Sequence, residues 1–287
     1  MKRQVTIEKS TELGFCCGVR RAISLLEKSA RSNHEIETLG PVVHNRQVVE
    51  ELEGKGIRQV ASLKDVRGRH VAITAHGTDP ETINEIQSRG LEVVDTTCSI
   101  VKSAQKAAAK YAAEGYGIII FGDPDHTEVR GITGWAGEKS LATTNPADIK
   151  RWKEMPKRLA VISQSTQSHS GFLKFIGKAL EATLPRLREV HIVNTICEVT
   201  QQRQAAAREL AGRCDLIIVV GGRNSANTRR LAETCGESAR TYAVETASEI
   251  RREWLKGKKH IGIVAGTSTP DDVVNDVFKK LESLTAA

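Results

Sequence analysis

Three cysteines carry most of the chemical signal in this sequence. Cys16, Cys98 and Cys197 are far apart in the chain, and each follows a short apolar run and precedes apolar residues at helical spacing. A cysteine in that position lies at the carboxyl end of a strand and the amino end of a helix, where open α/β sheets bind ligands. A helix amino terminus also lowers a thiol pKa and makes the sulfur a better metal ligand. The pattern therefore predicts one shared centre to which three segments each contribute a thiolate.

Histidines and small polar residues occupy the same kind of location, in turns that follow other expected strands or precede helices. Each one alone has an ordinary alternative as a helix cap or turn residue, because polar side chains favour helix amino termini. Their repeated placement favours a site for an anion such as a diphosphate, to which helix amino termini add N–H donors. The candidates are His44, His76, His126, Glu128, Ser165, Thr166, Ser225, Asn227 and Ser268.

The three thiolates leave the identity of the metal centre open. A zinc site of the Cys₃His type would take His126 as its fourth ligand. A 4Fe–4S cluster would use three cysteine ligands and leave one open iron, able to act as a Lewis acid and to supply electrons. The sequence has no CxxC pair, so zinc ribbons and fingers are not expected. Cys17, Cys214 and Cys235 lack the strand–cysteine–helix context and are expected to be small buried or incidental thiols.

Strands that alternate with helices must position these residues. Apolar runs such as 117–121, 159–162 and 216–220 are typical of strands in a parallel sheet, and 91–94 is also predicted to be a buried strand. The alternation predicts an α/β fold with mostly parallel sheets, divided into three small lobes. Further strands are expected at 5–8, 71–74, 190–193 and 261–264. The predicted lobes are 1–97, 98–195 and 196–287, the last with a closing C-terminal helix.

Composition limits the possible classes of protein. A hydrophobic fraction of 39% and an aromatic fraction of 4% describe a soluble globular chain, and no apolar run approaches the roughly 18–20 residues of a membrane span. The first residues lack an apolar signal core, so a cytoplasmic protein is expected. Six cysteines in such a compartment favour metal or redox use over disulfides. The net charge of +7 suits an anionic small substrate, and no recognition motif accompanies the basic residues, so neither nucleic acid nor a membrane is an expected partner.

A set of motifs runs through almost the whole chain. In order they are GFCCGVRRAI, LGPVVHNRQVVEEL, AHG, DTTCSIVK, HTEVRGITG, SQST, NTICEVTQQRQ, GGRNSANTRRLAE and AGTSTPDDVV. In this order and spacing they resemble the 4-hydroxy-3-methylbut-2-enyl diphosphate reductase family (the IspH/LytB type). The resemblance implies a trefoil of three α/β lobes around a central 4Fe–4S iron–sulfur cluster, and an enzyme of the last step of the non-mevalonate isoprenoid pathway.

The resemblance also implies roles for individual residues. Glu128 matches the residue tied to proton delivery, and His126 matches a position near the substrate's hydroxymethyl group. Ser165 falls where the family usually has a threonine close to the substrate, and Thr166 is next to it. The cluster ligands match Cys16, Cys98 and Cys197. The diphosphate-binding positions match His44, His76, Ser225, Asn227 and Ser268.

The expected reaction is the reductive dehydroxylation of (E)-4-hydroxy-3-methylbut-2-enyl diphosphate to isopentenyl and dimethylallyl diphosphates. Electrons would come from an external donor such as ferredoxin or flavodoxin. The chain departs from the usual family pattern at Ser99, Asp123, Thr127, Ser165 and Ala226, although none of these changes removes a ligand or the acid. Two alternatives therefore stay open: a paralogue that uses the same cluster on another allylic or anionic substrate, and a non-enzymatic iron–sulfur sensor or basic binding module.

Overall fold

The structure is a computed structural model that describes residues 5–33 and 35–286. Its strands form three four-stranded sheets, A, B and C, and every strand pair within them is parallel. Three parallel α/β lobes confirm the predicted fold class. The chain divides into two compact units: the first contains the segment up to Arg20, Val43–Glu51 and the chain from Glu198 onward, and the second contains Arg21–Val42 and Leu52–Cys197. No helix among the described residues is long and apolar enough to cross a membrane.

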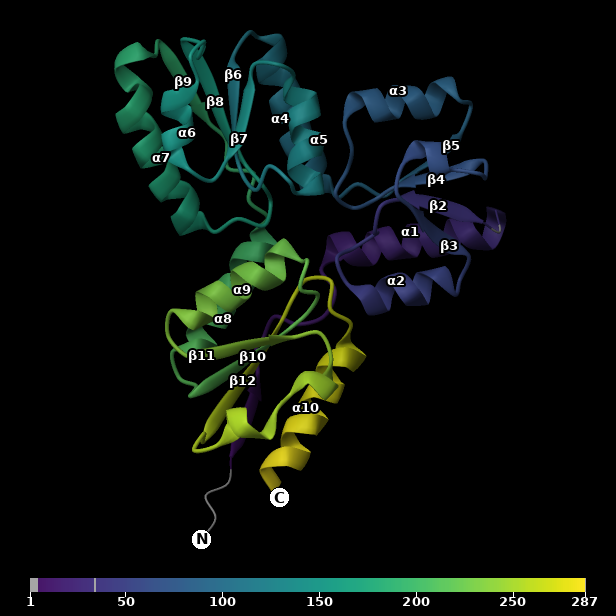
Figure 1. The fold of residues 1–287 in the computed structure, drawn as a ribbon, viewed down its shortest axis with the longest axis vertical. Coiled ribbons are helices and arrows are strands. Elements are labelled where there is room, and N and C mark those ends of the chain that lie inside the picture. Colours follow the sequence, from purple (N-terminus) through teal and green to yellow (C-terminus); the bar gives the residue numbers. More distant parts are fainter. Residues whose placement is uncertain (1–4, 34, 287) are drawn as a thin grey trace. The chain divides into compact units, whose positions relative to one another are not determined.

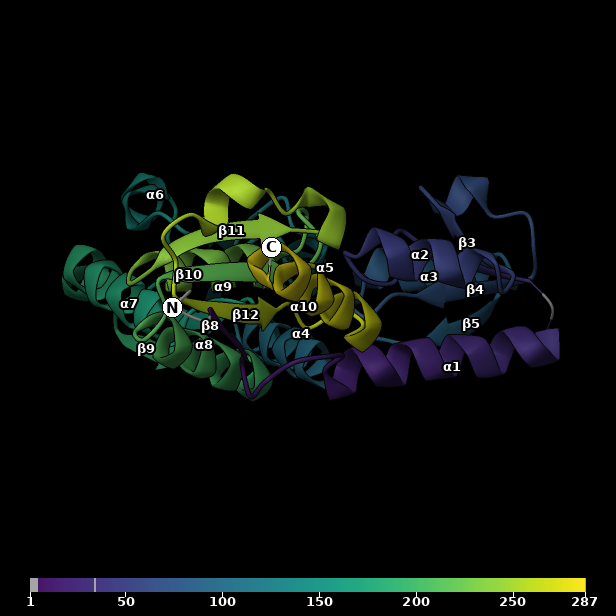
Figure 2. The same ribbon diagram turned by 90° about the horizontal axis from the view of Figure 1, so that it is seen from below.

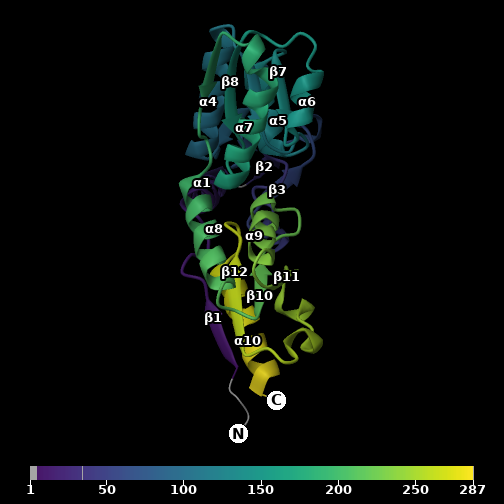
Figure 3. The ribbon, with the colours of Figure 1, turned by 90° about the vertical axis from the view of Figure 1, so that its left-hand side faces the viewer.

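Sheet A lies in the first unit. One of its two inner strands, β10 (Leu216–Val220), is buried along its whole length. Alternate residues of that strand belong to two apolar clusters, because the last helix covers one face of the sheet and two other helices cover the opposite face. Figures 1 and 3 show these layers. The elements of this sheet and its covering helices are β1 (Thr6–Lys9), α8 (Glu198–Ala211), β10 (Leu216–Val220), α9 (Ala226–Gly236), β11 (Arg240–Val244), η3 (Ala247–Glu249), η4 (Arg252–Leu255), β12 (His260–Ala265) and α10 (Asp271–Ala286).

The first strand of the chain pairs with the last one. The register places Thr6 of β1 opposite His260 of β12 and Lys9 opposite Ile263, and Figure 3 shows the two strands side by side. The N-terminal strand therefore belongs to the sheet of the C-terminal residues, a pairing that the predicted lobe 1–97 did not anticipate. Local sequence patterns carry no information about so distant a partner. The three lobe boundaries stay predictions.

Sheet B lies in the second unit, with the strand order β3-β2-β4-β5. Figure 2 shows α1 running along its strands. The prediction of a buried strand at 91–94 was wrong: β5 is an edge strand, and Val93 is 41% exposed, because only one neighbour and one covered face protect it. The elements are α1 (Cys17–Asn33), β2 (Ile36–Leu39), α2 (Arg46–Glu53), β3 (Ile57–Val60), η1 (Leu63–Asp65), β4 (His70–Ile73), α3 (Pro80–Ser88) and β5 (Glu92–Asp95).

Sheet C, also in the second unit, has the order β7-β6-β8-β9. One of its two inner strands, β6 (Gly117–Phe121), is buried throughout because helices cover both faces of the sheet. Helices α4 and α5 lie on one side and α6 and α7 on the other (Figure 1). The elements are α4 (Ser99–Ala113), β6 (Gly117–Phe121), α5 (Thr127–Ala136), β7 (Ser140–Thr143), α6 (Pro146–Arg151), β8 (Arg158–Ser163), α7 (His169–Thr183), η2 (Leu184–Arg186) and β9 (Glu189–Ile192).

The three sheets share one connectivity. In each sheet the strands lie in the order second, first, third, fourth, counted along the chain, if β1 is taken as the fourth strand of sheet A. The sequence showed no strong self-similarity, yet the structure repeats the same unit three times. The strands that the sequence did not predict are β3, β7 and β11, the second strand of each sheet. Each lies at a sheet edge and contains polar residues, so none forms a continuous apolar run.

Candidate active site

The repeated connectivity places the three predicted cysteine ligands at equivalent positions. Each follows the fourth strand of its sheet, so Cys16 comes after β1, Cys98 after β5 and Cys197 after β9. In every lobe the cysteine N–H donates to the backbone carbonyl two residues beyond the end of the third strand. These bonds join Cys16 to Thr267 at 3.1 Å, Cys98 to Ala75 at 3.0 Å and Cys197 to Ser165 at 2.9 Å.

Two of these cysteines belong to the second unit and interact electrostatically. Burial raises the pKa of the Cys98 thiol, and the neighbouring Cys197 and Glu128 raise it further. Backbone N–H groups of Ile100 and Val101, in the first turn of α4, donate to the Cys98 sulfur and lower its pKa. The neighbouring Cys197 and Glu128 thus oppose the ionisation of Cys98, and a bound cation would relieve that cost.

The third cysteine belongs to the first unit and has a similar local setting. The N–H of Val19, in the first turn of α1, donates to the Cys16 sulfur at 3.4 Å. Cys16, Cys98 and Cys197 are each half-buried, and none of them forms a disulfide within the described residues. N–H groups directed at thiolate sulfurs are a common means of tuning iron–sulfur centres. Cys16 and Cys98 both have such N–H groups at their sulfurs.

Glu128 is the buried acid of the second unit, with 2% of its surface exposed. Ser165 donates two hydrogen bonds to its carboxyl group, from the backbone N–H to Oε1 at 2.6 Å and from the hydroxyl to Oε2 at 2.8 Å. Burial raises the pKa of Glu128, while the two bonds from Ser165 lower it, and the net shift is upward. The protonated acid is therefore favoured more than in a solvent-exposed glutamate, as a proton donor requires.

Ser165 links this acid to the cysteine region, because the Ser165 carbonyl accepts the hydrogen bond from the Cys197 N–H. The structure thus brings Glu128, Ser165, Cys98 and Cys197 together. The serine that replaces the family's usual threonine keeps its hydroxyl on the carboxyl group. Thr166 follows Ser165 in the turn after β8 and is partly exposed.

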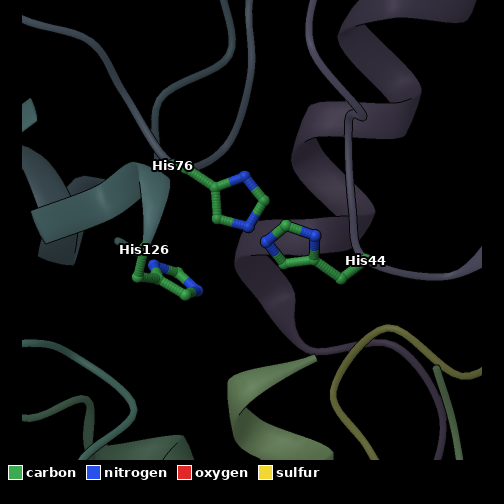
Figure 4. Close-up of side chains that lie close together, drawn as sticks. All are labelled: His44, His76 and His126. Carbon is green, nitrogen blue, oxygen red and sulfur yellow. The ribbon is translucent and has the colours of Figure 1, made fainter. Parts of the chain in front are cut away.

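One histidine contacts the backbone of the acid, and a second histidine contacts the first. His126 caps α5, and its Nδ1 accepts a hydrogen bond from the Glu128 N–H at 3.2 Å. That contact requires an unprotonated Nδ1, so a neutral His126 carries its proton on Nε2. The ring of His76 meets the ring of His126 edge to face, with centroids 5.6 Å apart, and Figure 4 shows both side chains. His76 comes from the turn after β4, so two neighbouring lobes of the same unit contribute these rings.

A second group of predicted residues gathers in the first unit, around the start of α9. Ser225 caps this helix through its hydroxyl, and Asn227 and Ser268 are also buried. Both polar atoms of the Asn227 side chain lie buried without a hydrogen-bond partner among the described residues. A buried primary amide with neither end bonded is costly unless a ligand completes it. The group therefore has the character of an anion site.

His44 belongs to the same unit and precedes α2. Burial lowers the pKa of His44, and the positive charge of Arg229 lowers it further. The backbone approaches closely here, since a Cβ on Gly222 would lie 2.0 Å from the His44 carbonyl oxygen. Only glycine fits at that position. The turn after β10 therefore packs directly against the backbone of His44. Arg229, which the sequence analysis did not single out, adds a charge that would attract an anion.

The family of the chain follows from comparison with known proteins. The family model described as "LytB protein" matches residues 7–282. The chain belongs to the LytB family. A relative from Dehalococcoides mccartyi, named 4-hydroxy-3-methylbut-2-enyl diphosphate reductase, is 45% identical over 98% of this chain and 99% of its own length. A relative of the same name from Pelobacter propionicus is 38% identical over 93% of this chain and 94% of its own.

Two solved LytB-type structures extend the comparison to the fold. One is described as (E)-4-hydroxy-3-methyl-but-2-enyl diphosphate reductase, the terminal enzyme of the non-mevalonate pathway; it has a TM-score of 0.69 and 34% identity, over 97% of this chain and 99% of that one. The other, a reductase from Plasmodium falciparum, has a TM-score of 0.89 and 26% identity over 96% and 87%. The likeness covers all three lobes.

Two further residues of this LytB chain support the site although the sequence did not reveal them. Arg203 on α8 is 3% exposed and donates to four backbone carbonyls, of Leu13, Gly14, Ala265 and Gly266. It thereby ties the segment before Cys16 to the exit of β12. A long polar residue on a helix is normally read as exposed, so only the tertiary contacts identify this role.

Gln164 holds the turn that leads to His126. Its side chain is fully buried, and Oε1 accepts hydrogen bonds from the Asp123 N–H at 3.1 Å and from the Gln167 amide at 3.2 Å. Its Nε2 has no partner among the described residues. The amide therefore fixes the approach to α5 and leaves one buried donor available at the end of β8.

Proposed function

We propose that this chain is a 4-hydroxy-3-methylbut-2-enyl diphosphate reductase. In the proposed reaction (E)-4-hydroxy-3-methylbut-2-enyl diphosphate loses its hydroxyl group as water and takes up two electrons, giving isopentenyl and dimethylallyl diphosphates. Membership of the LytB family and the names of the relatives support this assignment. The observation that carries it is the buried, proton-retaining Glu128 beside Cys98 and Cys197.

The proposed cofactor is a 4Fe–4S cluster held by Cys16, Cys98 and Cys197. Three equivalent strand exits, cysteines outside any disulfide of the described residues, and N–H groups near the sulfurs of Cys16 and Cys98 fit such a group. The cluster would supply electrons and a Lewis-acidic iron that no protein side chain ligates. The family resemblance favours it over the Cys₃His zinc site, which could not deliver electrons.

Glu128 is the proposed proton donor. Because its Oε2 lies 2.8 Å from the Ser165 hydroxyl, the acid can pass a proton through that hydroxyl toward the departing oxygen. His126 would hold the same oxygen through its Nε2–H, since its Nδ1 is occupied. Positioned general acids typically accelerate such a step by about 10²–10⁴-fold. Thr166 and His76 are proposed to complete the substrate contacts in this unit.

The diphosphate is proposed to bind His44, Ser225, Asn227 and Ser268, together with His76. The unbonded amide of Asn227 supports this most directly, since its N–H groups would pair with phosphate oxygens. The neutral His44 would offer one donor, and a bound dianion would raise its pKa again. The replacement of the family's serine by Ala226 leaves a backbone N–H at the start of α9, where the helix dipole favours an anion.

An anaerobic assay tests the proposal. Purified protein is reduced chemically and supplied with the hydroxymethylbutenyl diphosphate, and the two product diphosphates are quantified by chromatography. The matched pair Cys16→Ser and Cys17→Ser provides the control, because the two residues are neighbours and Cys17 is exposed. Wild type and Cys17→Ser should contain roughly four iron and four sulfide per chain and form product, whereas Cys16→Ser should lose both. A zinc-loaded, colourless and inactive wild type would refute the proposal.

The electron donor stays a prediction. Ferredoxin and flavodoxin are both small carriers of suitable potential, and replacing the chemical reductant with each in turn in the same assay distinguishes them. Binding of nucleic acid or of a membrane is not part of the proposed function.

A further inference from the structure

A cavity of about 610 Å³ lies in the second unit, apart from every residue proposed above to hold cluster or substrate. Its apolar wall is formed by Ile73, Ile83, Ala109 and Trp135. Its volume is within the range of about 300–1,000 Å³ that is usual for small-molecule sites. The walls come from α4, α5 and the segments around β4, α3 and β5.

The apolar wall is held in place by hydrogen bonds. The Trp135 Nε1–H donates to the Thr78 carbonyl at 2.9 Å, and the Gln105 amide donates to the same carbonyl at 3.1 Å. The one polar atom of Trp135 is therefore satisfied, so its ring presents apolar surface to the cavity. A preformed wall of this kind lowers the ordering cost of binding an apolar chain.

The rim of the cavity is basic. Lys102, Lys106 and Lys110 recur every fourth residue of α4 and all line the cavity. Asp95, the one acidic lining residue, pairs with Lys102 at 2.5 Å. Lys106 and Lys110 are exposed and form no ion pair with a carboxylate in the described part of the chain. The lining thus has an apolar wall and a surplus of positive charge at one edge.

We propose that this cavity binds an anionic amphiphile, an apolar chain of about ten carbons that ends in a diphosphate. The chain would lie against Trp135 and Ile83, and the head group would pair with Lys106 and Lys110. Molecules of this class form when a five-carbon allylic diphosphate condenses with isopentenyl diphosphate and releases inorganic pyrophosphate. If such a ligand regulates the enzyme, that role rests on the proposed function, because the ligand is built from the proposed products. The binding itself does not rest on it.

Two lining residues of the cavity are close along the chain to residues of the candidate active site. Thr78 lies two residues after His76, and Thr97 directly precedes Cys98. Gly77, between His76 and Thr78, has a positive φ of 72°, and a Cβ there would lie 2.5 Å from the Gln105 amide nitrogen. A ligand that displaces Gln105 or Thr78 must therefore disturb the His76 turn. Because His76 is a proposed substrate contact, occupancy should weaken substrate binding and raise KM.

Titration calorimetry of the anaerobic holoprotein with geranyl diphosphate tests binding independently of turnover. Inorganic pyrophosphate and geraniol supply the head group and the chain separately, and each should bind at least about tenfold more weakly. Ala109→Phe fills the cavity, and the pair Lys106→Glu and Lys110→Glu reverses the rim; each change should weaken binding at least about tenfold. The double reversal of Lys174 and Lys178, exposed at the same spacing on α7, should leave binding within about twofold.

The variant Asn227→Ala separates this site from the proposed substrate site. Geranyl diphosphate should still bind to this variant with unchanged affinity, even if the proposed reaction is wrong. Equal binding by the Ala109→Phe variant, or equally tight binding of inorganic pyrophosphate, would overturn the inference. It would also be overturned if reversal of Lys106 and Lys110 left the affinity for geranyl diphosphate unchanged and slowed reduction by an acidic protein donor. The rim would then serve protein docking.

Discussion

Replacing Glu128 by Gln tests the central element of the proposed mechanism, because it removes the proton and little else. The amide oxygen can accept the Ser165 N–H that now lies 2.6 Å from Oε1, and the amide nitrogen can donate to the Ser165 hydroxyl, 2.8 Å from Oε2. Both contacts can therefore be kept, the second with donor and acceptor exchanged, and the side chain keeps nearly the same shape. Any loss of rate then reports on the proton itself.

The expected loss follows from general acid catalysis. A factor of about 10²–10⁴ corresponds to about 2.7–5.4 kcal/mol of activation free energy, at about 1.36 kcal/mol per tenfold change. Single-turnover kinetics under anaerobic conditions measure the step directly, and the cluster spectrum and substrate affinity should match wild type. Glu138→Gln, at an exposed position just after α5, is the matched control and should leave the rate unchanged.

The same substitution should stabilise the protein, and the sign follows from the raised pKa. The unfolded chain loses the Glu128 proton near pH 4.5, whereas the folded protein holds it to higher pH. As the pH rises above about 4.5, the unfolded state is favoured by ionisation and wild type loses stability. Gln cannot ionise, so the difference in the free energy of unfolding, variant minus wild type, should grow above pH 4.5.

Urea unfolding at several pH values measures this difference. A rate within a few-fold of wild type would show that Glu128 is not the donor. A variant that is less stable than wild type at neutral pH would show that burial does not penalise the ionised acid. Loss of rate with the predicted gain in stability would be the signature of a carboxyl group retained for function at a cost to the fold.

Three further predictions concern the first unit. Asn227→Ala should weaken substrate binding about 10–100-fold in a spectroscopic titration with the cluster intact, whereas Asn224→Ala, an exposed residue of the same turn, should not; equal effects would assign Asn227 a structural role. Gly222→Ala should displace the His44 segment and lower substrate affinity at least about tenfold, and unchanged affinity would show that His44 does not bind substrate. Arg203→Met leaves four backbone carbonyls without their donor and should lower the free energy of unfolding by at least about 2 kcal/mol in urea titration; a smaller loss would mean that water replaces the guanidinium.

The sequence by itself determined the class of fold and the residue types of the site. Runs such as Gly117–Phe121 and Leu216–Val220 are apolar throughout because both sheet faces are covered, and that local pattern predicts parallel α/β lobes. The cysteines were recognisable because each falls between a strand and a helix. Strands β3 and β7 were missed because polar residues interrupt their apolar runs, and the burial of β5 was misjudged because its local sequence does not show that it lies at a sheet edge.

Only the tertiary structure decided which residues act on one another. Burial raises the pKa of Glu128 and the hydrogen bonds from Ser165, 37 residues away, lower it, and periodicity carries no record of either effect. The pairing of β1 with β12 and the four carbonyl contacts of Arg203 likewise join segments that are distant in the chain. Local patterns determine which face of an element is buried, but its partners depend on how parallel strands cross over, which is a property of the whole chain.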